Sequence, residues 1–219
     1  MVSQNSLAQT FKALHKPGEP VILTNVWDAI SAKAVAALPE TRALATASYA
    51  VALAAGLEDN ELTFDANLRG AAAVAKVAKA FGKPLTVDFQ DGYGDRLEEG
   101  VRKLVEIGAV GINLEDFSRE KDGLYKIDEA VARVRTALKA AADAGVPDFV
   151  VNARTDALLA GLSVDEAIKR GKAYLDAGAT TTFIWGGGRG WDNEGRGGKG
   201  GKGAGGRLNV SLVRIVPGA

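Results

Sequence analysis

The sequence predicts an α/β protein built as a (β/α)₈ barrel of the TIM type. Short apolar strands alternate with amphipathic helices along the chain, which is typical of a parallel sheet. Seven such strands within 219 residues fit a closed barrel better than an open, doubly wound sheet. The glycine-rich turn of a dinucleotide fold is also missing after the first strand, where Thr24-Asn25-Val26-Trp27-Asp28 stands instead.

The apolar segments that we predict as strands are residues 21–23, 43–45, 85–88, 110–115, 149–154, 181–185 and 208–212. Between them lie helical patterns, each with a start or stop signal. The first helix carries Leu7, Phe11 and Leu14, and Asp28 caps a second that carries Ile30, Val35 and Leu38. A third helix covers residues 62–81, and a fourth begins near Leu97 and ends at Gly108. A fifth carries Ile127, Val131, Val134 and Leu138. The capping box Ser163-Val164-Asp165-Glu166 opens a sixth, with Val164, Ile168, Gly171 and Leu175 inward.

We interpret the chain, residues 1–219, as a single barrel domain with an anomalous segment at 186–206. Glycine fills 12 of these 21 positions. Because each glycine costs a helix about 1 kcal/mol relative to alanine, the segment is not expected to be a regular helix. It is a flexible anion-binding loop, a disordered linker, or a stretch that does not represent the natural element. We expect the last, since the strands on both sides need a covering crossover. The barrel is expected to be incomplete at the C-terminus of this chain.

Composition excludes several classes of site and partner. Lys plus Arg equals Asp plus Glu at 27 each, which argues against a nucleic-acid or membrane-surface partner. The chain has no cysteine and one histidine, His15, so a thiolate site, a cysteine nucleophile and a histidine-rich metal centre are excluded. The N-terminal residues do not resemble a signal peptide, and no apolar run approaches the roughly 18 residues of a membrane span. A cytoplasmic protein is the expectation.

Polar residues follow the ends of the predicted strands, where the active site of a parallel barrel lies. In chain order they are Asn25 and Asp28, Ser48, Asp88, Gln90 and Asp91, Glu115 and Asp116, Arg154 and Asp156, and Trp185. Carboxylates that meet at one mouth beside an arginine suggest a hard divalent cation next to an anionic substrate. Taken singly, Asp28, Asp116 and Asp156 could instead be helix caps or turn residues, Asp91 could belong to a plain turn, and Arg154 could form a structural ion pair.

Five segments together resemble the isocitrate lyase/phosphoenolpyruvate mutase superfamily. They are Asn25-Val26-Trp27-Asp28-Ala29-Ile30-Ser31-Ala32, Thr46-Ala47-Ser48-Tyr49-Ala50-Val51-Ala52 with Gly56-Leu57-Glu58-Asp59, Asp88-Phe89-Gln90-Asp91-Gly92-Tyr93-Gly94, residues 108–116, and Asn152-Ala153-Arg154-Thr155-Asp156-Ala157. They occur in the order and spacing of the superfamily, from about residue 20 to 185. The set is specific for the superfamily and much less specific for one reaction within it.

The resemblance implies a role for each matching position. Asp88 would bind Mg²⁺, or Mn²⁺ in its place, with Glu115, Asp59 and Gln90 ordering the waters of the metal. The segment Ser48, Tyr49 and Ala50 would hold a substrate carboxylate, and Arg154 would clamp a second substrate oxygen with its planar fork of donors. Arg154 and Glu115 are therefore the candidate catalytic residues. The shared chemistry of the superfamily is a C–C or C–P bond made or broken next to the enolate of a small 2-oxo or 2-hydroxy acid.

Two departures from the superfamily pattern bear on the reaction. Many relatives carry an acid at the position of Gln90. The loop 117–125 lacks both the Lys-x-Cys-Gly motif of the lyases and the Thr- and Asn-containing loop of the mutases and phosphonopyruvate hydrolases. We expect a carbon–carbon lyase of carboxylic acid metabolism. The alternatives are a C–P phosphomutase or phosphonopyruvate hydrolase-like enzyme, and a catalytically weakened barrel that binds a metabolite. The resemblance also implies a homo-oligomer, a tetramer or a dimer.

Overall fold

Parallel strands in barrel order form the centre of the molecule. The computed structural model describes residues 3–17, 19–186 and 208–209. Seven strands pair in the order β1-β2-β3-β4-β7-β8-β9, and all of these pairings are parallel. Their bounds are Thr24–Val26, Leu44–Thr46, Leu85–Asp88, Gly111–Glu115, Val150–Thr155, Thr181–Ile184 and Leu208–Asn209. Each strand lies beside the next along the sheet, as in a barrel, which confirms the predicted class; among the described residues the sheet is open, with β1 and β9 at its edges.

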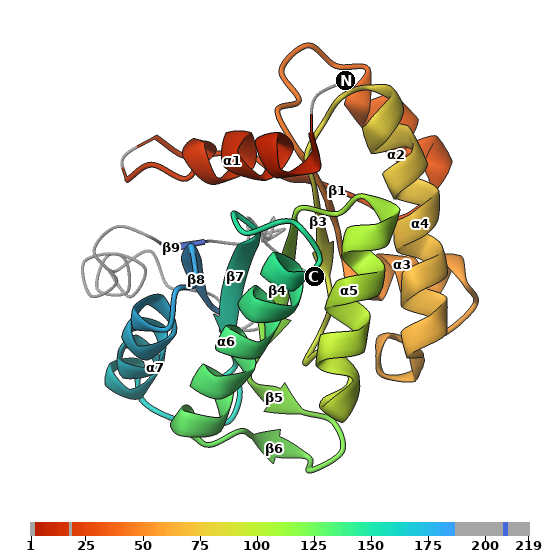
Figure 1. Cartoon of the computed structure of the whole chain (residues 1–219). Helices are drawn as coiled ribbons and strands as arrows, with labels where there is room; N and C mark the ends of the chain where they lie inside the picture. The colour runs from red at the N-terminus through yellow and green to blue at the C-terminus, as the bar shows by residue number, and fades with distance from the viewer. Residues whose placement is uncertain (1–2, 18, 187–207, 210–219) are drawn as a thin grey trace, which may run out of the picture.

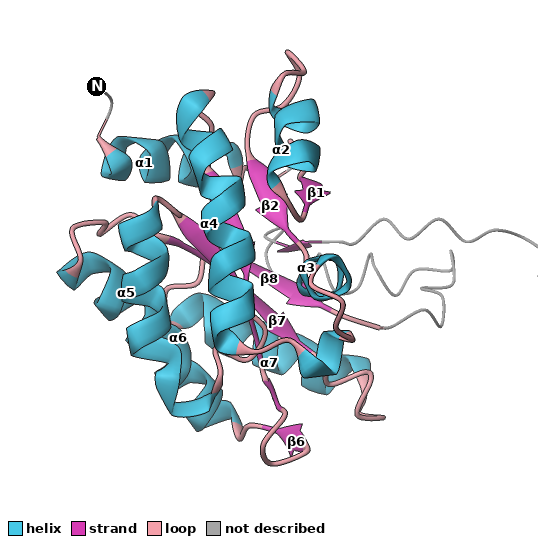
Figure 2. Cartoon of the chain, turned by 90° about the vertical axis from the view of Figure 1, so that its right-hand side faces the viewer, coloured by secondary structure: helices cyan, strands magenta, loops and turns pink. Residues whose placement is uncertain are grey.

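Helices cover one face of this sheet (Figure 2). The α-helices are α1 Gln4–Leu14, α2 Ala29–Ala36, α3 Ser48–Ala54, α4 Phe64–Ala80, α5 Leu97–Ile107, α6 Ile127–Asp143 and α7 Val164–Asp176, with short 3₁₀ turns η1 at Asp59–Glu61 and η2 at Gly94–Arg96. Five of these helices form a row in chain order, in which α2 packs against α4, α4 against α5, α5 against α6 and α6 against α7. Of the helices that the structure describes, none has both the length and the apolar character to cross a bilayer.

The two ends of the strands carry different elements (Figure 1). Helix α1 lies across the end where the strands begin, and Gln4 fastens it by donating to the carbonyls of Val105 and Ala109 at 2.8 and 2.9 Å. At the opposite end, β5 (Phe117–Ser118) and β6 (Gly123–Leu124) form a small antiparallel hairpin after β4. The hairpin therefore lies at the carboxyl ends of the strands.

The apolar core lies between the sheet and its helices. Strand residues such as Val87, Ile112 and Val151 pack there against Leu104 of α5 and Val134 of α6. Each of these side chains is almost fully buried, and burial of one such side chain is worth about 1.5–3 kcal/mol. The opposite, inner face of β3, β4 and β7 carries polar side chains, and these build the candidate site.

Several local signals in the sequence are confirmed. Asp28 caps α2 in a reciprocal capping box with Ser31, and Gly108 ends α5 in the left-handed conformation at φ 107°. Ser163 caps α7 by accepting from the N–H of Glu166. The second half of the predicted Ser163–Glu166 box is wrong, because the Glu166 side chain bonds Arg170 instead.

Three predicted apolar faces are confirmed only in part. Residues 21–23 precede β1 and are not a strand; Val21 and Leu23 pack against the core, whereas Ile22 is 77% exposed. Helix α2 buries alanines beside Val35, and Ile30 and Leu38 are exposed. Helix α7 buries Gly171 and Leu175 as predicted, but its inner face also includes Arg170 and Tyr174.

The anomalous glycine-rich segment falls almost entirely outside the described residues. Of residues 186–206, only Gly186 is described. The strands predicted on its two sides do pair in parallel, Thr182 with Leu208 and Phe183 with Asn209. The expectation that this stretch does not represent the natural element stays a prediction.

Gly100 in α5 allows that helix to pack against Phe89, the residue between Asp88 and Gln90. A Cβ at this position would lie 2.3 Å from Cζ of Phe89 and 2.9 Å from Cε2 of Phe64. We predict that Gly100→Ala destabilises the protein, because overpacking costs about 1–3 kcal/mol and exceeds the gain of about 1 kcal/mol that alanine brings to a helix. Denaturant unfolding measures the difference, with the exposed Lys103→Ala of the same helix as the control. A Gly100→Ala protein as stable as the parent would contradict this packing.

Candidate active site at the carboxyl ends of β3, β4 and β7

A ladder of polar side chains crosses four strands on the inner face. Asp88, Asn113, Asn152 and Thr181 are in register on β3, β4, β7 and β8. The Thr181 hydroxyl donates to Oδ1 of Asn152 at 2.7 Å, the Asn152 amide to Oδ1 of Asn113 at 2.7 Å, and the Asn113 amide to Oδ1 of Asp88 at 3.0 Å. All three bonds run in the same direction and end on the Asp88 carboxylate, which is therefore held in one orientation.

The other Asp88 oxygen faces the second strand. The backbone N–H of Ser48, the first residue of α3, donates to Oδ2 of Asp88 at 2.9 Å. The N–H of Asp88 in turn donates to the Thr46 hydroxyl at 2.9 Å. The sequence segment Ser48-Tyr49-Ala50 thus lies directly beside the candidate metal residue, with Ser48 buried and the Tyr49 side chain exposed.

A second layer, one step nearer the carboxyl ends, contains Glu115 and Arg154. These residues are in register on β4 and β7, and Nη1 of Arg154 lies 3.1 Å from Oε2 of Glu115. The guanidinium also binds Asp156 through two hydrogen bonds: Nε donates to Oδ1 at 2.6 Å and Nη2 donates to Oδ2 at 2.8 Å. A fork that binds one carboxylate in this two-point way is rigidly oriented. Arg154 is thus placed as predicted, and in this structure its donors are engaged by two carboxylates.

Burial and like charges perturb this layer. The pKa of Glu115 is raised to about 8, chiefly by burial; Arg154 lowers it, and Asp156 and Asp88 add to the rise. The pKa of the Asp156 carboxyl is also raised, first by burial, with Arg154 acting against the rise. For Arg154, burial alone would lower the pKa, but Glu115 and Asp156 outweigh it and the net shift is upward. The layer therefore holds one permanent cation, the guanidinium of Arg154, beside two carboxyl groups, those of Glu115 and Asp156.

The loop after β3 brings Gln90 and Asp59 together. Gln90 has a left-handed backbone at φ 51°, and its carbonyl accepts the N–H of Glu115 at 2.8 Å. Its side-chain amide donates to the carbonyl and to Oδ1 of Asp59, both at 3.1 Å. Arg119 of the β5–β6 hairpin also donates to the Asp59 carbonyl at 2.8 Å. Oε1 of Gln90 is buried and has no hydrogen-bond partner.

These residues fit a hard divalent cation. On the inner face, Asp88, Glu115 and Asp156 carry three negative charges when ionised against the one positive charge of Arg154, a formal excess of two. Oε1 of Gln90 is an orphaned acceptor beside them. Among the described residues, no three His, Asp or Glu side chains lie close enough together to hold a metal ion by themselves. Mg²⁺ does not require such a group, because it keeps several waters and uses one or two carboxylates.

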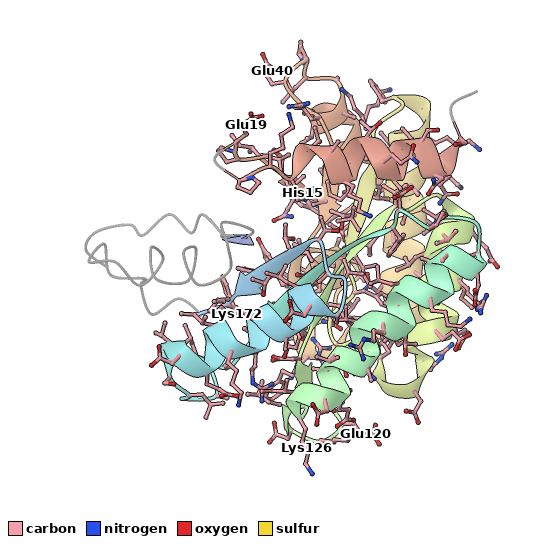
Figure 3. All side chains as sticks on the ribbon, turned by 60° about the vertical axis from the view of Figure 1, so that its left-hand side comes forward. His15, Glu19, Glu40, Glu120, Lys126 and Lys172 are labelled. Atoms are coloured by element: carbon pink, nitrogen blue, oxygen red, sulfur yellow. The ribbon has the colours of Figure 1, made fainter. Side chains whose placement is uncertain are left out.

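Other strand-end acids have structural roles. Asp28 caps α2. The carboxylate of Asp91 accepts the N–H of Tyr93 and the hydroxyl of Tyr125, both at 2.9 Å, and Asp116 points to the outer face of the sheet. His15 lies at the far end of the molecule from Glu120, in the turn of the hairpin, and from Lys126, which follows it (Figure 3).

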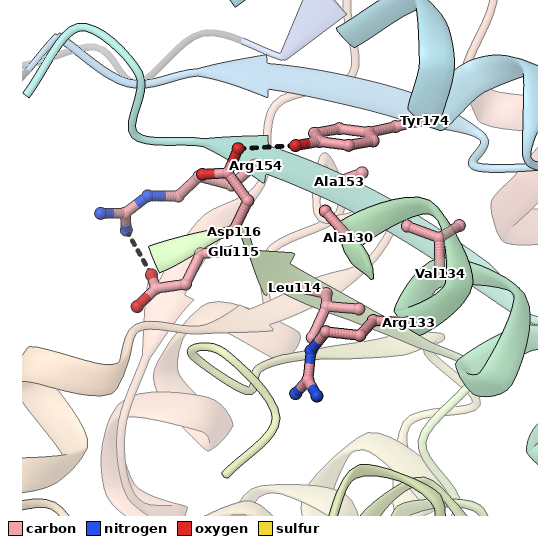
Figure 4. A pocket seen from close by; sticks show the side chains of 9 residues that line it. All are labelled: Leu114, Glu115, Asp116, Ala130, Arg133, Val134, Ala153, Arg154 and Tyr174. Atoms are coloured by element: carbon pink, nitrogen blue, oxygen red, sulfur yellow. Dashed lines mark hydrogen bonds and ion pairs between the residues drawn. The ribbon is translucent and has the colours of Figure 1, made fainter. Parts of the chain in front are cut away.

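A small cavity behind the site is not a substrate pocket (Figure 4). Its volume is about 10 Å³, which is room for about one water molecule. It is lined by Leu114, Glu115, Asp116, Ala130, Arg133, Val134, Ala153, Arg154 and Tyr174. These residues come from β4, β7 and the helices α6 and α7, so the cavity lies in the layer between sheet and helices.

Sequence reasoning missed the partners that orient the predicted residues. Asn113 and Asn152 each precede a predicted site residue, Glu115 or Arg154, by two positions. Because side chains alternate along a strand, they share its face, and this spacing could have identified them. Arg170 and Tyr174 of α7 gave no such signal, since charged and aromatic residues on a helix usually have a face in solvent.

Comparison with known proteins places the chain among enzymes of one family. The family model for phosphoenolpyruvate phosphomutase matches residues 11–192. An uncharacterized protein of Mycobacterium tuberculosis is 34% identical over 178 residues, which cover 80% of this chain and 64% of that protein. The 2-methylisocitrate lyase of Escherichia coli is 34% identical over 120 residues, 50% of this chain and 39% of the lyase. The chain thus spans less than two thirds of the length of these relatives.

Solved structures agree with this placement. Phosphonopyruvate hydrolase in complex with oxalate and Mg²⁺ is 27% identical, with a TM-score of 0.76 over 87% of this chain and 66% of that one. A crystal structure of 2,3-dimethylmalate lyase, a member of the PEP mutase/isocitrate lyase superfamily, is 25% identical, with a TM-score of 0.71 over 84% of this chain and 64% of the lyase. Family model and structures coincide, and the chain belongs to the phosphoenolpyruvate phosphomutase family, within the isocitrate lyase/PEP mutase superfamily.

Proposed function

We propose that this chain forms a Mg²⁺-dependent enzyme that breaks a C–C bond next to an enolate in a small 2-oxo or 2-hydroxy carboxylic acid. The observation that carries the proposal is the inner face of β3, β4 and β7. There Asp88 lies in register with Asn113, and Glu115 and Asp156 pair with Arg154 one step nearer the strand ends. The site combines oxygen ligands for a hard cation with a guanidinium for an anion.

Each residue has a definite task in this proposal. Asp88 and Glu115 hold the cation, with Asp59 and Oε1 of Gln90 ordering its waters; the cation, when bound, supplies a Lewis acid that stabilises negative charge on an enolate oxygen. Arg154 binds a substrate oxygen or carboxylate. Asp88 is already fixed by the ladder from Thr181, so little reorganisation is needed when charge develops.

The segment Ser48, Tyr49 and Ala50 is proposed to hold the substrate carboxylate. Ser48 is buried beside Asp88, so a carboxylate bound there would lie next to the cation. In the ligand-free arrangement the N–H of Ala50 donates to the Ala47 carbonyl at 3.1 Å. The Ser48 N–H already donates to Asp88, so the Ser48 hydroxyl is the donor of this segment that we expect to meet the ligand.

Cleavage of a C–C bond is placed ahead of transfer of a phosphoryl group because the Thr- and Asn-containing loop of the mutases and hydrolases is absent from residues 117–125. A C–P phosphomutase or phosphonopyruvate hydrolase is the second candidate, since the solved hydrolase with oxalate and Mg²⁺ has this fold.

The deciding experiment measures ligand binding and then turnover. Oxalate, a mimic of the pyruvate enolate, should raise the melting temperature of the chain only when Mg²⁺ is present. Turnover of oxaloacetate and 2-methylisocitrate would then support the lyase, and turnover of phosphonopyruvate alone would transfer the proposal to the C–P enzymes. Binding without turnover of any of the three would leave a weakened, metabolite-binding barrel.

We further propose that Mn²⁺ can replace Mg²⁺, that the protein acts in the cytoplasm, and that it forms a homo-oligomer, a tetramer or a dimer. The exposed apolar side chains Ile30 and Leu38 of the α2 region and Leu53 of α3 support an association. Light scattering coupled to gel filtration measures the oligomer, and a monomer at all concentrations would contradict it.

Arg154→Lys tests the anion-binding role. Lysine keeps the charge but loses the planar fork, and hydrogen bonds of charged groups are worth about 1.5–3 kcal/mol. We predict that the variant folds and that its affinity for oxalate with Mg²⁺ falls about tenfold or more in calorimetry. Arg102→Lys, at an exposed pair with Glu98, should change neither property. A variant that melts far below the parent yet binds oxalate normally would assign Arg154 a structural role only.

Glu115 should make the stability of the metal-free chain depend on pH. Its pKa is raised from 4.5 to about 8, so between these values the folded state holds a proton that the unfolded state has released. Stability therefore falls as the pH rises through this window, and the loss is complete above it. We predict that the melting temperature in chelator falls less between about pH 5 and pH 8.5 for Glu115→Gln than for the parent, because glutamine does not titrate. Equal slopes would show that Glu115 ionises normally.

A further inference from the structure

A buried charged cluster lies on the outer face of the sheet, directly behind the candidate site. Asp116 follows Glu115, so its side chain points to the opposite face, where it is 2% exposed. Its Oδ2 accepts the hydroxyl of Tyr174 at 2.6 Å, the hydroxyl of Thr155 at 2.8 Å and Nη1 of Arg170 at 3.0 Å. Tyr174 and Arg170 come from α7, so Asp116 links the end of β4 to that helix (Figure 4).

Asp116 also bonds every residue of the short segment that carries the guanidinium of the site. Its N–H donates to the Arg154 carbonyl at 3.1 Å. Its Oδ2 holds the Thr155 hydroxyl, and its Oδ1 accepts the N–H of Asp156 at 2.9 Å. Three consecutive residues, 154–156, are therefore tied to Asp116, the first through its backbone N–H and the other two through its carboxylate. Since Asp156 grips Arg154 through two bonds, the direction of the Arg154 fork depends on where Asp116 holds this segment.

We propose that Asp116, held by Tyr174 and Arg170, is a positioning residue that sets the Arg154–Asp156 pair for ligand binding. The proposal rests on the proposed function for the identity of the ligand that Arg154 meets. The fixed geometry of Arg154 is independent of the proposed function.

The energetics of the cluster support a role in orientation. A buried ion pair such as Asp116 with Arg170 costs desolvation, and well-packed apolar residues are often as stabilising. What the cluster adds is direction, because four donors converge on one carboxylate and fix its two oxygens. Burial and the neighbouring Asp116 raise the pKa of the Tyr174 hydroxyl, so this hydroxyl remains a donor in the physiological range.

The same cluster closes the base of the β5–β6 hairpin. The N–H of Tyr125 donates to the Asp116 carbonyl at 2.8 Å, and Nη1 of Arg170 donates to the Tyr125 carbonyl at 3.0 Å. The hairpin carries Arg119, which bonds Asp59. The Asp116 cluster thus anchors, from behind the sheet, both the Arg154 end of the site and the hairpin at its rim.

Tyr174→Phe tests the proposal, because it removes one hydroxyl and keeps the buried ring. The matched control is Tyr125→Phe, which removes a hydroxyl bonded to another carboxylate, that of Asp91. The first readout is the NMR signal of the Nε–H of Arg154 in the full, ligand-free chain, assigned by its loss in Arg154→Lys. The bond to Asp156 should give a slowly exchanging signal; we expect Tyr174→Phe to broaden or shift it and Tyr125→Phe to leave it unchanged.

The second readout is the affinity for oxalate with Mg²⁺ in two backgrounds. Tyr174→Phe should weaken binding several-fold in the parent and have no further effect in Arg154→Lys, because residues that act through one another are not additive. An unchanged Arg154 signal, or equal weakening in both backgrounds, overturns the proposal.

The two proposals can fail separately. If the parent does not bind oxalate, the proposed function fails, and the NMR signal alone decides whether Asp116 positions Arg154. Should Tyr174→Phe not fold, Thr155→Val removes another donor to the same oxygen and is measured in its place.

Discussion

The pairing of two buried carboxylates with one guanidinium is the interaction on which the rest of the site depends. Glu115 and Asp156 both contact Arg154, and like charges held close together in a buried layer repel strongly. Burial is the main cause of the raised pKa of Glu115, and the nearby charges of Asp156 and Asp88 add to it. Such a layer is tolerated only if each charge is held by hydrogen bonds, and the surrounding structure supplies them from three sides.

The inner ladder supplies the first of these sides. Because β3, β4, β7 and β8 are parallel and in register, Asn113 and Asn152 fall on the same line as Asp88. Each asparagine amide donates through its nitrogen and accepts through its oxygen. All the hydrogen bonds of the ladder therefore run in one direction, from Thr181 to Asp88. The loop after β3 supplies the second side through the Gln90 carbonyl, which accepts the Glu115 N–H. The outer cluster at Asp116 supplies the third.

The sequence predicts the parallel sheet and the strand ends well because both depend on local patterns. The strand at Leu85–Asp88 is observed with the predicted bounds, and Asp88, Glu115 and Arg154 lie together because parallel strands share one end. The prediction is wrong for Ile22, which precedes the first strand of the sheet and is exposed. An apolar run predicts burial whether or not another element covers it. The inner face of α7 is predicted only in part, for a different reason: Gly171 and Leu175 are buried as expected, but Arg170 is buried beside Asp116, a partner 54 residues away in sequence. Such a long-range partner leaves no periodic signal.

Gln90 illustrates why fold and family are easier to infer than the reaction. An acid at this position would bring a further carboxylate to a layer with one guanidinium, and it would lose the amide that donates to Asp59. Glutamine avoids that repulsion and directs Asp59 through a neutral donor, while its unpartnered Oε1 still offers an acceptor. In the proposed function, the cation site would therefore keep its geometry with less negative charge, which would weaken its binding of a cation and lower its repulsion of an anionic substrate. Changes of this size leave the barrel intact because they alter one side chain in a loop and no strand, so members with different reactions can share the same sheet.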